Sequence, residues 1–186
     1  MTNKLSEVAL IQFGPYLQSK DSGRIKYLQV RQFNDLGEPE YPADEFILNE
    51  DEAGNNLLND GDVLLVSKGN RLFAWRYRLN FGPAIASSIF FVLKPHKDLI
   101  DPDFLAAVLN YSQTKKALQV LGGGSNIFSI RKSELADFKI PVLSISKQKA
   151  LAKLSGLHSD EINIVQKLMR EKQNLFTGYV SKILND

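Results

Sequence analysis

The sequence predicts an α+β fold: a mixed sheet with packed helices over residues 1–143, followed by a long coiled-coil-type helix over residues 144–186. Three observations lead to this prediction. Short β-favouring runs separated by turn residues fill the N-terminal half. One well-marked helix begins after Asp101, and from Ser146 onward there is no proline and apolar residues recur at helical spacing.

The first elements are short. Residues 5–11 fit either a helix or a strand, and residues 26–30 form a strand candidate between two turn-forming pairs. Residues 36–59 are acidic and rich in turn formers, with apolar anchors only at residues 46–48. A tight turn then leads into residues 63–66 (VLLV), which we expect to be a short buried strand.

The middle of the chain carries the clearest signals. Residues 68–70 form a turn, residues 71–78 interleave basic and aromatic side chains, and residues 84–93 have the strongest strand pattern. A helix follows, in which Asp101 is a good N-cap and Pro102 fits the first turn. Gly122 ends this helix and is followed by a flexible Gly-rich loop.

The segment after this loop is shorter and less regular. We expect residues 127–130 to be extended, residues 133–135 to form a turn and residues 138–140 to form a final strand before Pro141.

The last segment has a 3-4 apolar repeat, with Lys172 at one of the repeat positions. An unbroken helix here is ~58 Å long at 1.5 Å per residue, too long to pack entirely on the preceding domain. The alternative is a helix folded back onto its own domain. We expect a dimer interface formed by Ile162, Val165, Met169, Phe176, Tyr179 and Ile183.

Bulk properties limit the class of protein. The chain has 186 residues, 44% of them hydrophobic, and no cysteine, which excludes disulfides and thiolate metal sites. We expect a cytoplasmic protein, because the N-terminus has no signal-peptide pattern and no apolar run reaches the ~18 residues of a membrane span.

Charge is segregated along the chain, although the net charge is only +2. Residues 35–62 hold acidic side chains and no Lys or Arg, whereas residues 63–97 hold basic side chains and no acid. A basic stripe is what phosphate contact requires, and a solvated surface is the alternative. The basic side chains of the second segment are Lys68, Arg71, Arg76, Arg78, Lys94 and Lys97.

Motifs for catalysis are missing. His96 and His158 lack metal-ligand spacing, and the glycines at 122–124 fit neither a phosphate-binding loop nor a dinucleotide fingerprint. Asp103 and Asp137 imitate a nuclease pattern, but Asp103 falls in the first turn of a helix. We therefore expect no catalytic residue, no metal and no cofactor.

In order along the chain, six segments resemble the specificity subunits of type I restriction–modification systems. Leu143 and Lys147 depart from the family pattern, which often has Pro and Glu there, and the chain has one domain and one helical region where the family has two. It looks like a half-subunit. The matching segments are LSEVA (5–9) with Gly14, YLQVR (27–31), DGDVLL (60–65), ASSIFFVL (86–93), IDPDFL (100–105), and IPV (140–142) with Gln148.

This resemblance implies a non-catalytic target recognition domain that reads part of a split double-stranded DNA site. It also implies a helix that docks DNA adenine methyltransferase subunits, which bind S-adenosylmethionine, in a complex that includes a motor–nuclease subunit. A single unit is expected to form an antiparallel homodimer, with Lys172 at the rim or paired with Glu171 of the other copy.

For DNA contact we favour Lys68, Arg71, Arg76 and Arg78, with Ser125 and Asn126 as second choices. Trp75 fits either a stacking residue or a core aromatic. Two other functions remain open: a module that binds RNA or single strands, and a helical protein-interaction adaptor without nucleic-acid binding.

Overall fold

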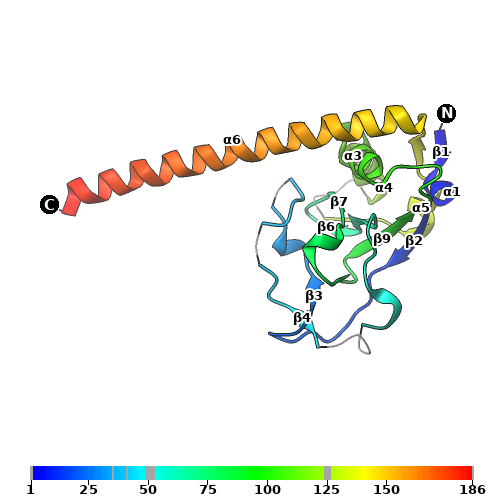
Figure 1. Cartoon of the computed structure of the whole chain (residues 1–186), viewed down its shortest axis with the longest axis horizontal. Helices are drawn as coiled ribbons and strands as arrows, with labels where there is room; N and C mark the ends of the chain where they lie inside the picture. Colours follow the sequence, from blue (N-terminus) through cyan, green and yellow to red (C-terminus); the bar gives the residue numbers. More distant parts are fainter. Residues whose placement is uncertain (1, 35, 41, 49–52, 124–126, 186) are drawn as a thin grey trace.

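The computed structural model describes residues 2–34, 36–40, 42–48, 53–123 and 127–185. It has the predicted α+β architecture: a globular part (residues 2–143) and the long helix α6 (Ile145–Asn185), which runs along one side of it and continues past it (Figure 1). The globular part contains a four-stranded sheet, a three-stranded sheet and two short ladders.

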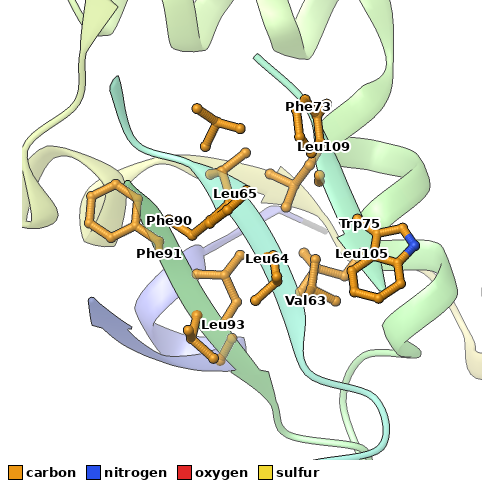
Figure 2. Close-up of a cluster of buried hydrophobic side chains, with 14 of the residues drawn as sticks. Val63, Leu64, Leu65, Phe73, Trp75, Phe90, Phe91, Leu93, Leu105 and Leu109 are labelled. Carbon is orange, nitrogen blue, oxygen red and sulfur yellow. The ribbon is translucent and has the colours of Figure 1, made fainter. Parts of the chain in front are cut away.

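The four-stranded sheet, in the order β2-β9-β5-β7, forms the centre of the core. All of its pairings are antiparallel, and every residue of the central strand β5 is buried, as the VLLV pattern predicts. Figure 2 shows β5 side chains between those of β9 and those of β7 and helix α3. The bounds are β2 Ala9–Phe13, β5 Val63–Val66, β7 Ala74–Arg76, β9 Phe90–Pro95 and α3 Pro102–Asn110.

The second sheet is mixed. Strand β3 pairs antiparallel with β4 and parallel with β8. Two short ladders join distant segments, β1 with β11 and β6 with β10. The bounds are β1 Thr2–Lys4, β3 Ile25–Leu28, β4 Phe46–Ile47, β6 Lys68–Gly69, β8 Ala84–Ala86, β10 Phe128–Ser129 and β11 Lys139–Pro141.

The short helical elements lie between the strands. Their bounds are α1 Leu5–Val8, α4 Ser112–Leu121 and α5 Lys132–Asp137, with 3₁₀ turns at Val30–Gln32, Gly54–Asn56 and Leu79–Phe81. Residues 5–11, which fit either a helix or a strand by sequence, form a helix followed directly by a strand. Helix α1 buries Leu5 and Val8, and β2 then alternates, with Ile11 buried and Leu10 exposed.

Two predicted elements, one strand and one helix, are each divided in two in the structure. Residues 84–93 are two strands of different sheets, because the chain turns after Ser87, whose carbonyl accepts from the Phe90 N–H at 3.0 Å. The helix beginning at Asp101 is two helices, with Tyr111 in an extended conformation between them. Its start is as predicted: the Asp101 side chain accepts from the Phe104 N–H at 3.0 Å.

Gly14 explains part of the first break. A Cβ at this position would come within 2.2 Å of the Ser87 carbonyl oxygen, so only glycine permits the two segments to approach this closely. The Gly14 N–H donates to the Phe90 carbonyl at 3.0 Å, which ties the end of β2 to the start of β9.

The predicted long helix is confirmed as α6. Its first half packs on α3, and Ala152, Ser155, Ser159 and Ile162 in this half are partly buried. Beyond residue 163 the described side chains of α6 are exposed. Arg170 is still tied to the globular part by an ion pair with Glu40, 2.8 Å between Nη1 and Oε1. The first half of the helix therefore packs on its own domain, and the second half, apart from the Arg170–Glu40 ion pair, extends away from it.

Candidate nucleic-acid interface

The predicted basic segment does not form one continuous surface. Strands β5 and β7 pair so that Val63 faces Arg76 and Leu65 faces Ala74. Lys68 therefore follows one end of the strand pair, and Arg76 lies at the opposite end. Because a strand rises about 3.3 Å per residue, these two cationic groups are well separated, at opposite ends of the paired strands.

At one end, two carboxylates engage Arg76 and Arg78. Arg76 Nη2 donates to Asp60 Oδ2 at 2.8 Å, and Arg78 Nη2 donates to Asp103 Oδ1 at 2.6 Å. The Leu79 N–H, with the nearby Arg76 and Lys97 cations, holds the pKa of Asp60 below its usual value. The Arg78–Asp103 pair fastens the β7 end to the first turn of α3, and the Arg76–Asp60 pair fastens it to the turn before β5.

The two arginines differ in how accessible they are. The Arg76 side chain is only 14% exposed, and its Nε lies 3.8 Å from Asp103 Oδ1 without a hydrogen bond to any described residue. Arg78 is 55% exposed. Arg78 thus retains donors that face solvent, whereas Arg76 is mainly a structural link.

Arg71 is also occupied within the fold. Its Nη2 donates to the Phe33 carbonyl at 2.7 Å and to the Asn34 carbonyl, and its guanidinium lies 5.7 Å from the centre of the Phe73 ring. Both carbonyls follow the 3₁₀ turn at Val30–Gln32. The guanidinium therefore holds the backbone of the segment that follows β3 in place.

Lys68 is exposed and lies in the β6–β10 ladder, directly opposite Ser129. The Ile130 N–H donates to the Ser67 carbonyl at 2.8 Å, which extends the contact toward the exposed Arg131 and Lys132. We call Lys68, Ser129, Arg131 and Lys132 the cationic ribbon. Ser125 and Asn126 lie outside the described residues.

Sequence reasoning missed Arg131 and Lys132. The β-type pattern of residues 127–130 predicts an extended segment, but nothing local identifies β6 as its partner. The register of the ladder sets Ser129 opposite Lys68, and the Ile130–Ser67 hydrogen bond extends this pairing to the residue before Arg131.

Trp75 is a core aromatic. It is buried, with its ring centroid 5.4 Å from Phe33 and 5.1 Å from Phe81. Stacking of Trp75 on an unpaired base is therefore not available in this structure, which removes the main sequence argument for a single-strand binder.

The junction between the globular part and α6 is built around Gln148, whose side chain is fully buried. Its Oε1 accepts from the Asp101 N–H at 2.8 Å, and its Nε2 donates to the carbonyls of Leu99 at 3.0 Å and Leu143 at 2.8 Å. One side chain thus joins the segments that lead into α3 and α6.

Beyond this junction, a groove of about 1300 Å³ runs between α6 and the surface formed by α3, α4 and β7. Burial lowers the pKa of Lys115, whose side chain lines this groove. The lining also includes Val108, Tyr111, Leu143 and Leu151.

The predicted apolar stripe of α6 is largely open to solvent. Val165, Met169, Phe176, Tyr179 and Ile183 are exposed, and only Ile162 is partly buried. A second group of exposed apolar residues lies beside this stripe: Leu157, Ile164, Leu168 and Leu175. Large apolar side chains exposed at this density are typical of a protein-interaction surface.

The described residues hold no group of three or more His, Cys, Asp and Glu side chains that fits a metal ion. The two carboxylates of the nuclease-like pattern have separate ion-pair partners, Arg78 for Asp103 and Lys4 for Asp137 at 2.7 Å. Within the part of the chain that the structure describes, no helix is both long and apolar enough to cross a bilayer.

Comparison with known proteins gives a consistent result. Two solved structures share the fold over 90% of this chain: the HsdS subunit from Thermoanaerobacter tengcongensis (TM-score 0.64, 16% identity) and the type I restriction–modification S subunit from M. genitalium (TM-score 0.62, 15% identity). The chain spans about two fifths of their length, 39% and 41%.

A curated relative, a putative type I restriction enzyme MjaX specificity subunit from Methanocaldococcus jannaschii, is 35% identical over 75 residues, which are 40% of this chain and 17% of the relative. The family model for the type I restriction modification DNA specificity domain matches residues 1–169. The chain therefore belongs to the family of type I restriction modification DNA specificity domains.

Proposed function

We propose that this chain recognises one half of a bipartite duplex DNA site for a type I restriction–modification complex. In this proposal residues 1–143 are the recognition domain, and residues 144–186 join it to partner proteins. The family match over residues 1–169 carries the proposal. In this proposal the subunit acts on DNA in the cytoplasm and catalyses no reaction itself.

The DNA-contacting surface is the cationic ribbon, with Arg78 as a further contact. Lys68, Arg131 and Lys132 are exposed beside a two-stranded ladder, where their charges can meet phosphates. Arg131 also pairs with Glu134 at 3.7 Å, an exposed contact that a phosphate can replace. Arg76 lies beside Arg78 at the other end of the β5–β7 pair, and it and Arg71 are held by acceptors within the fold. Ser125 and Asn126, which come shortly before β10 in sequence, remain candidates for base contacts.

The long helix has two apolar faces, and each fits one kind of partner. The stripe from Ile162 to Ile183 suits an antiparallel homodimer, because its 3-4 spacing is that of a coiled-coil seam. The second group, which includes Ile164 and Leu168, is left uncovered by that pairing and suits helices of the methyltransferase subunits. The motor–nuclease subunit joins through that complex.

The DNA surface is tested by titrating duplex and single-stranded DNA over a series of salt concentrations. Wild-type protein is expected to prefer duplex, and Lys68→Ala with Arg131→Ala is expected to reduce the salt slope by about 0.9 for each phosphate that the variant no longer neutralises. Lys149→Ala with Lys153→Ala, on the exposed start of α6, is the matched control and should leave the slope unchanged. Preference for single strands, or an unchanged slope in the ribbon variant, would contradict the proposed surface.

The dimer is tested by sedimentation. Val165→Asp with Phe176→Asp should give a monomer, because each buried apolar side chain contributes about 1.5–3 kcal/mol. Lys167→Asp with Asn174→Asp, on the same helix but off both apolar faces, should remain dimeric. The monomeric variant should lose affinity for a two-half-site duplex far more than for a single half-site.

The proposed lack of chemistry has a direct check. Incubation of the chain with plasmid and Mg²⁺ should give no nicking, and labelled S-adenosylmethionine should transfer no methyl group.

A further inference from the structure

One end of the four-stranded sheet brings the loop after β2 close to the cationic ribbon. Strand β9 lies between β2 and β5, and Phe13 of β2 and Leu65 of β5 are both opposite Phe91. With about 4.8 Å between neighbouring strands, the ends of β2 and β5 are about 10 Å apart. Lys68 follows β5 at this end of the sheet, and Tyr16 follows β2 at the same end.

Direct contacts link the end of β2 to the ribbon. Gly14 packs so closely on the Ser87 carbonyl that a Cβ at Gly14 would lie 2.2 Å from that oxygen. In the turn that follows Ser87, the Ile89 carbonyl accepts from both the N–H and the Oγ of Ser67 at 2.8 Å. Ser67 directly precedes Lys68. The end of β2, the turn before β9 and the ribbon therefore form an unbroken series of contacts.

Tyr16, in the loop after β2, is 88% exposed although its backbone is held in place. The peptide groups on both sides of it bind one hydroxyl group. Tyr27 Oη donates to the Pro15 carbonyl at 2.7 Å and accepts from the Leu17 N–H at 3.1 Å. Tyr27 is itself buried in β3, and the ring of Pro15 fixes its own φ. The backbone at Tyr16 is therefore constrained before any partner binds.

An exposed aromatic side chain on a constrained backbone suits recognition, because little conformational entropy is lost when a partner covers it. On duplex DNA, phosphate contacts position a protein and base-edge contacts specify the sequence. The major groove is about 12 Å wide, which is comparable to the distance between the ends of β2 and β5. The loop adds no net positive charge, since Lys20 is followed directly by Asp21. Its contribution to binding therefore comes from Tyr16 and not from attraction to phosphates.

We propose that the ring of Tyr16 contacts the edge of a base in the major groove, while the cationic ribbon contacts phosphates beside that groove. Tyr27 is the positioning residue for this contact. The inference rests on the proposed function and extends it, because it assigns sequence reading to an uncharged side chain outside the ribbon. The ribbon then supplies affinity that depends on salt, and Tyr16 supplies a sequence preference that does not.

The test is a selection from duplexes that carry a stretch of random sequence, performed with the wild-type chain and with Tyr16→Ala. The variant is expected to lose the wild-type preference at one base-pair position and to bind the duplex selected by wild type about 10-fold more weakly, as is usual for one lost base contact. Because Tyr16 is uncharged, its salt slope should equal that of wild type, unlike the slope of Lys68→Ala with Arg131→Ala. Tyr16→Phe keeps the ring and should keep the preference.

Two further variants accompany the test. Tyr111→Ala also removes an exposed aromatic side chain, but one that lines the groove beside α6, and it should bind like wild type. Tyr27→Phe removes both hydrogen bonds to the loop and should weaken binding to the selected duplex. In a chain that already carries Tyr16→Ala, Tyr27→Phe should have no further effect on binding. An equal effect of Tyr27→Phe in both backgrounds would overturn its assignment as the positioning residue.

The remaining outcomes separate this inference from the proposed function. A Tyr16→Ala chain that keeps wild-type affinity and preference overturns the base contact, and so does one that binds selected and random duplexes more weakly by the same factor. If the ribbon variant alters the salt slope while Tyr16→Ala changes nothing, the base contact fails and the proposed function stands. A wild-type chain that binds no duplex overturns both.

Discussion

Replacing Gln148 should weaken the attachment of the long helix more than any other single change in α6. The side chain is fully buried, and its amide bonds one N–H and two carbonyl groups in the segments that precede α3 and α6. Gln148→Ala removes this partner from all three groups. An unsatisfied buried polar group costs about 1–3 kcal/mol, and water entering the vacated space recovers part of it, so we expect a total loss of about 2–4 kcal/mol.

The measurement is urea unfolding followed by circular dichroism and by the fluorescence of Trp75, the single tryptophan, which reports on the globular part. Lys147→Ala and Lys149→Ala, exposed neighbours on the same turn, are the matched controls and should change stability by less than about 0.5 kcal/mol. A Gln148→Ala protein as stable as these controls would refute the role of this side chain as the joint.

Gln148→Glu adds a pH signature that a simple packing defect lacks. The ionised carboxylate would face the two carbonyl oxygens that Nε2 now contacts, so the folded state favours its protonated form and raises its pKa. A carboxyl whose pKa is higher in the folded state than in the unfolded state binds its proton more tightly when folded, so stability falls as pH rises. The Glu variant should therefore approach wild-type stability only in acid.

Three further predictions concern the globular part. Asn110→Ala should lower the free energy of unfolding by about 1–2 kcal/mol in urea titrations, because the Asn110 amide bonds both backbone groups of Ala74 at 3.0 and 2.7 Å on the edge of the sheet. Arg71→Met should speed hydrogen exchange in residues 30–34, whose carbonyls it contacts, while leaving the salt slope of DNA binding unchanged. Burial, with Asp160 nearby, raises the pKa of Glu38, so Glu38→Gln should stabilise the protein at neutral pH and reduce the loss of stability that accompanies rising pH, as thermal unfolding over a pH series will show.

Local signals account for the elements that the sequence predicts well. The N-cap at Asp101, the buried strand β5 and the length of α6 depend on residues within a few positions of one another, and all three agree with the structure. The breaks after Ser87 and at Tyr111 depend on distant partners. Ser87 donates its N–H to the Leu28 carbonyl at the end of β3, which no local pattern reports.

The candidate DNA site is harder to predict for the same reason. Basic residues close together in sequence predict a shared surface, but the β5–β7 register separates Lys68 from Arg76. The acceptors of Arg76 and Arg71 lie 16 and 38 residues away in sequence, at Asp60 and Phe33. Conversely, the ladder opposite Lys68 brings in Arg131, which sequence proximity could not suggest.

The proposed homodimer makes α6 a spacer between the two recognition domains, so its length limits how far apart the two half-sites can lie. An antiparallel pair places the two globular parts toward opposite ends of the helix pair, and the 41 residues of α6 span about 62 Å at 1.5 Å per residue. One turn of B-DNA is about 34–36 Å, so both domains meet the same face of the duplex when the half-site centres are a whole number of turns apart, that is, multiples of about 10 base pairs.

The length of this spacer can change only in steps that preserve the seam. A one-heptad insertion keeps the apolar repeat in register and lengthens the spacer by about 10.5 Å, or roughly 3 base pairs of duplex. Because B-DNA completes a turn in about 10–10.5 base pairs, the same insertion turns the second half-site about 100° around the DNA axis. The two-fold axis of the helix pair holds both recognition domains on one side, so they cannot follow that rotation without twisting the duplex. The spacing of the site and the length of the helix therefore cannot change independently.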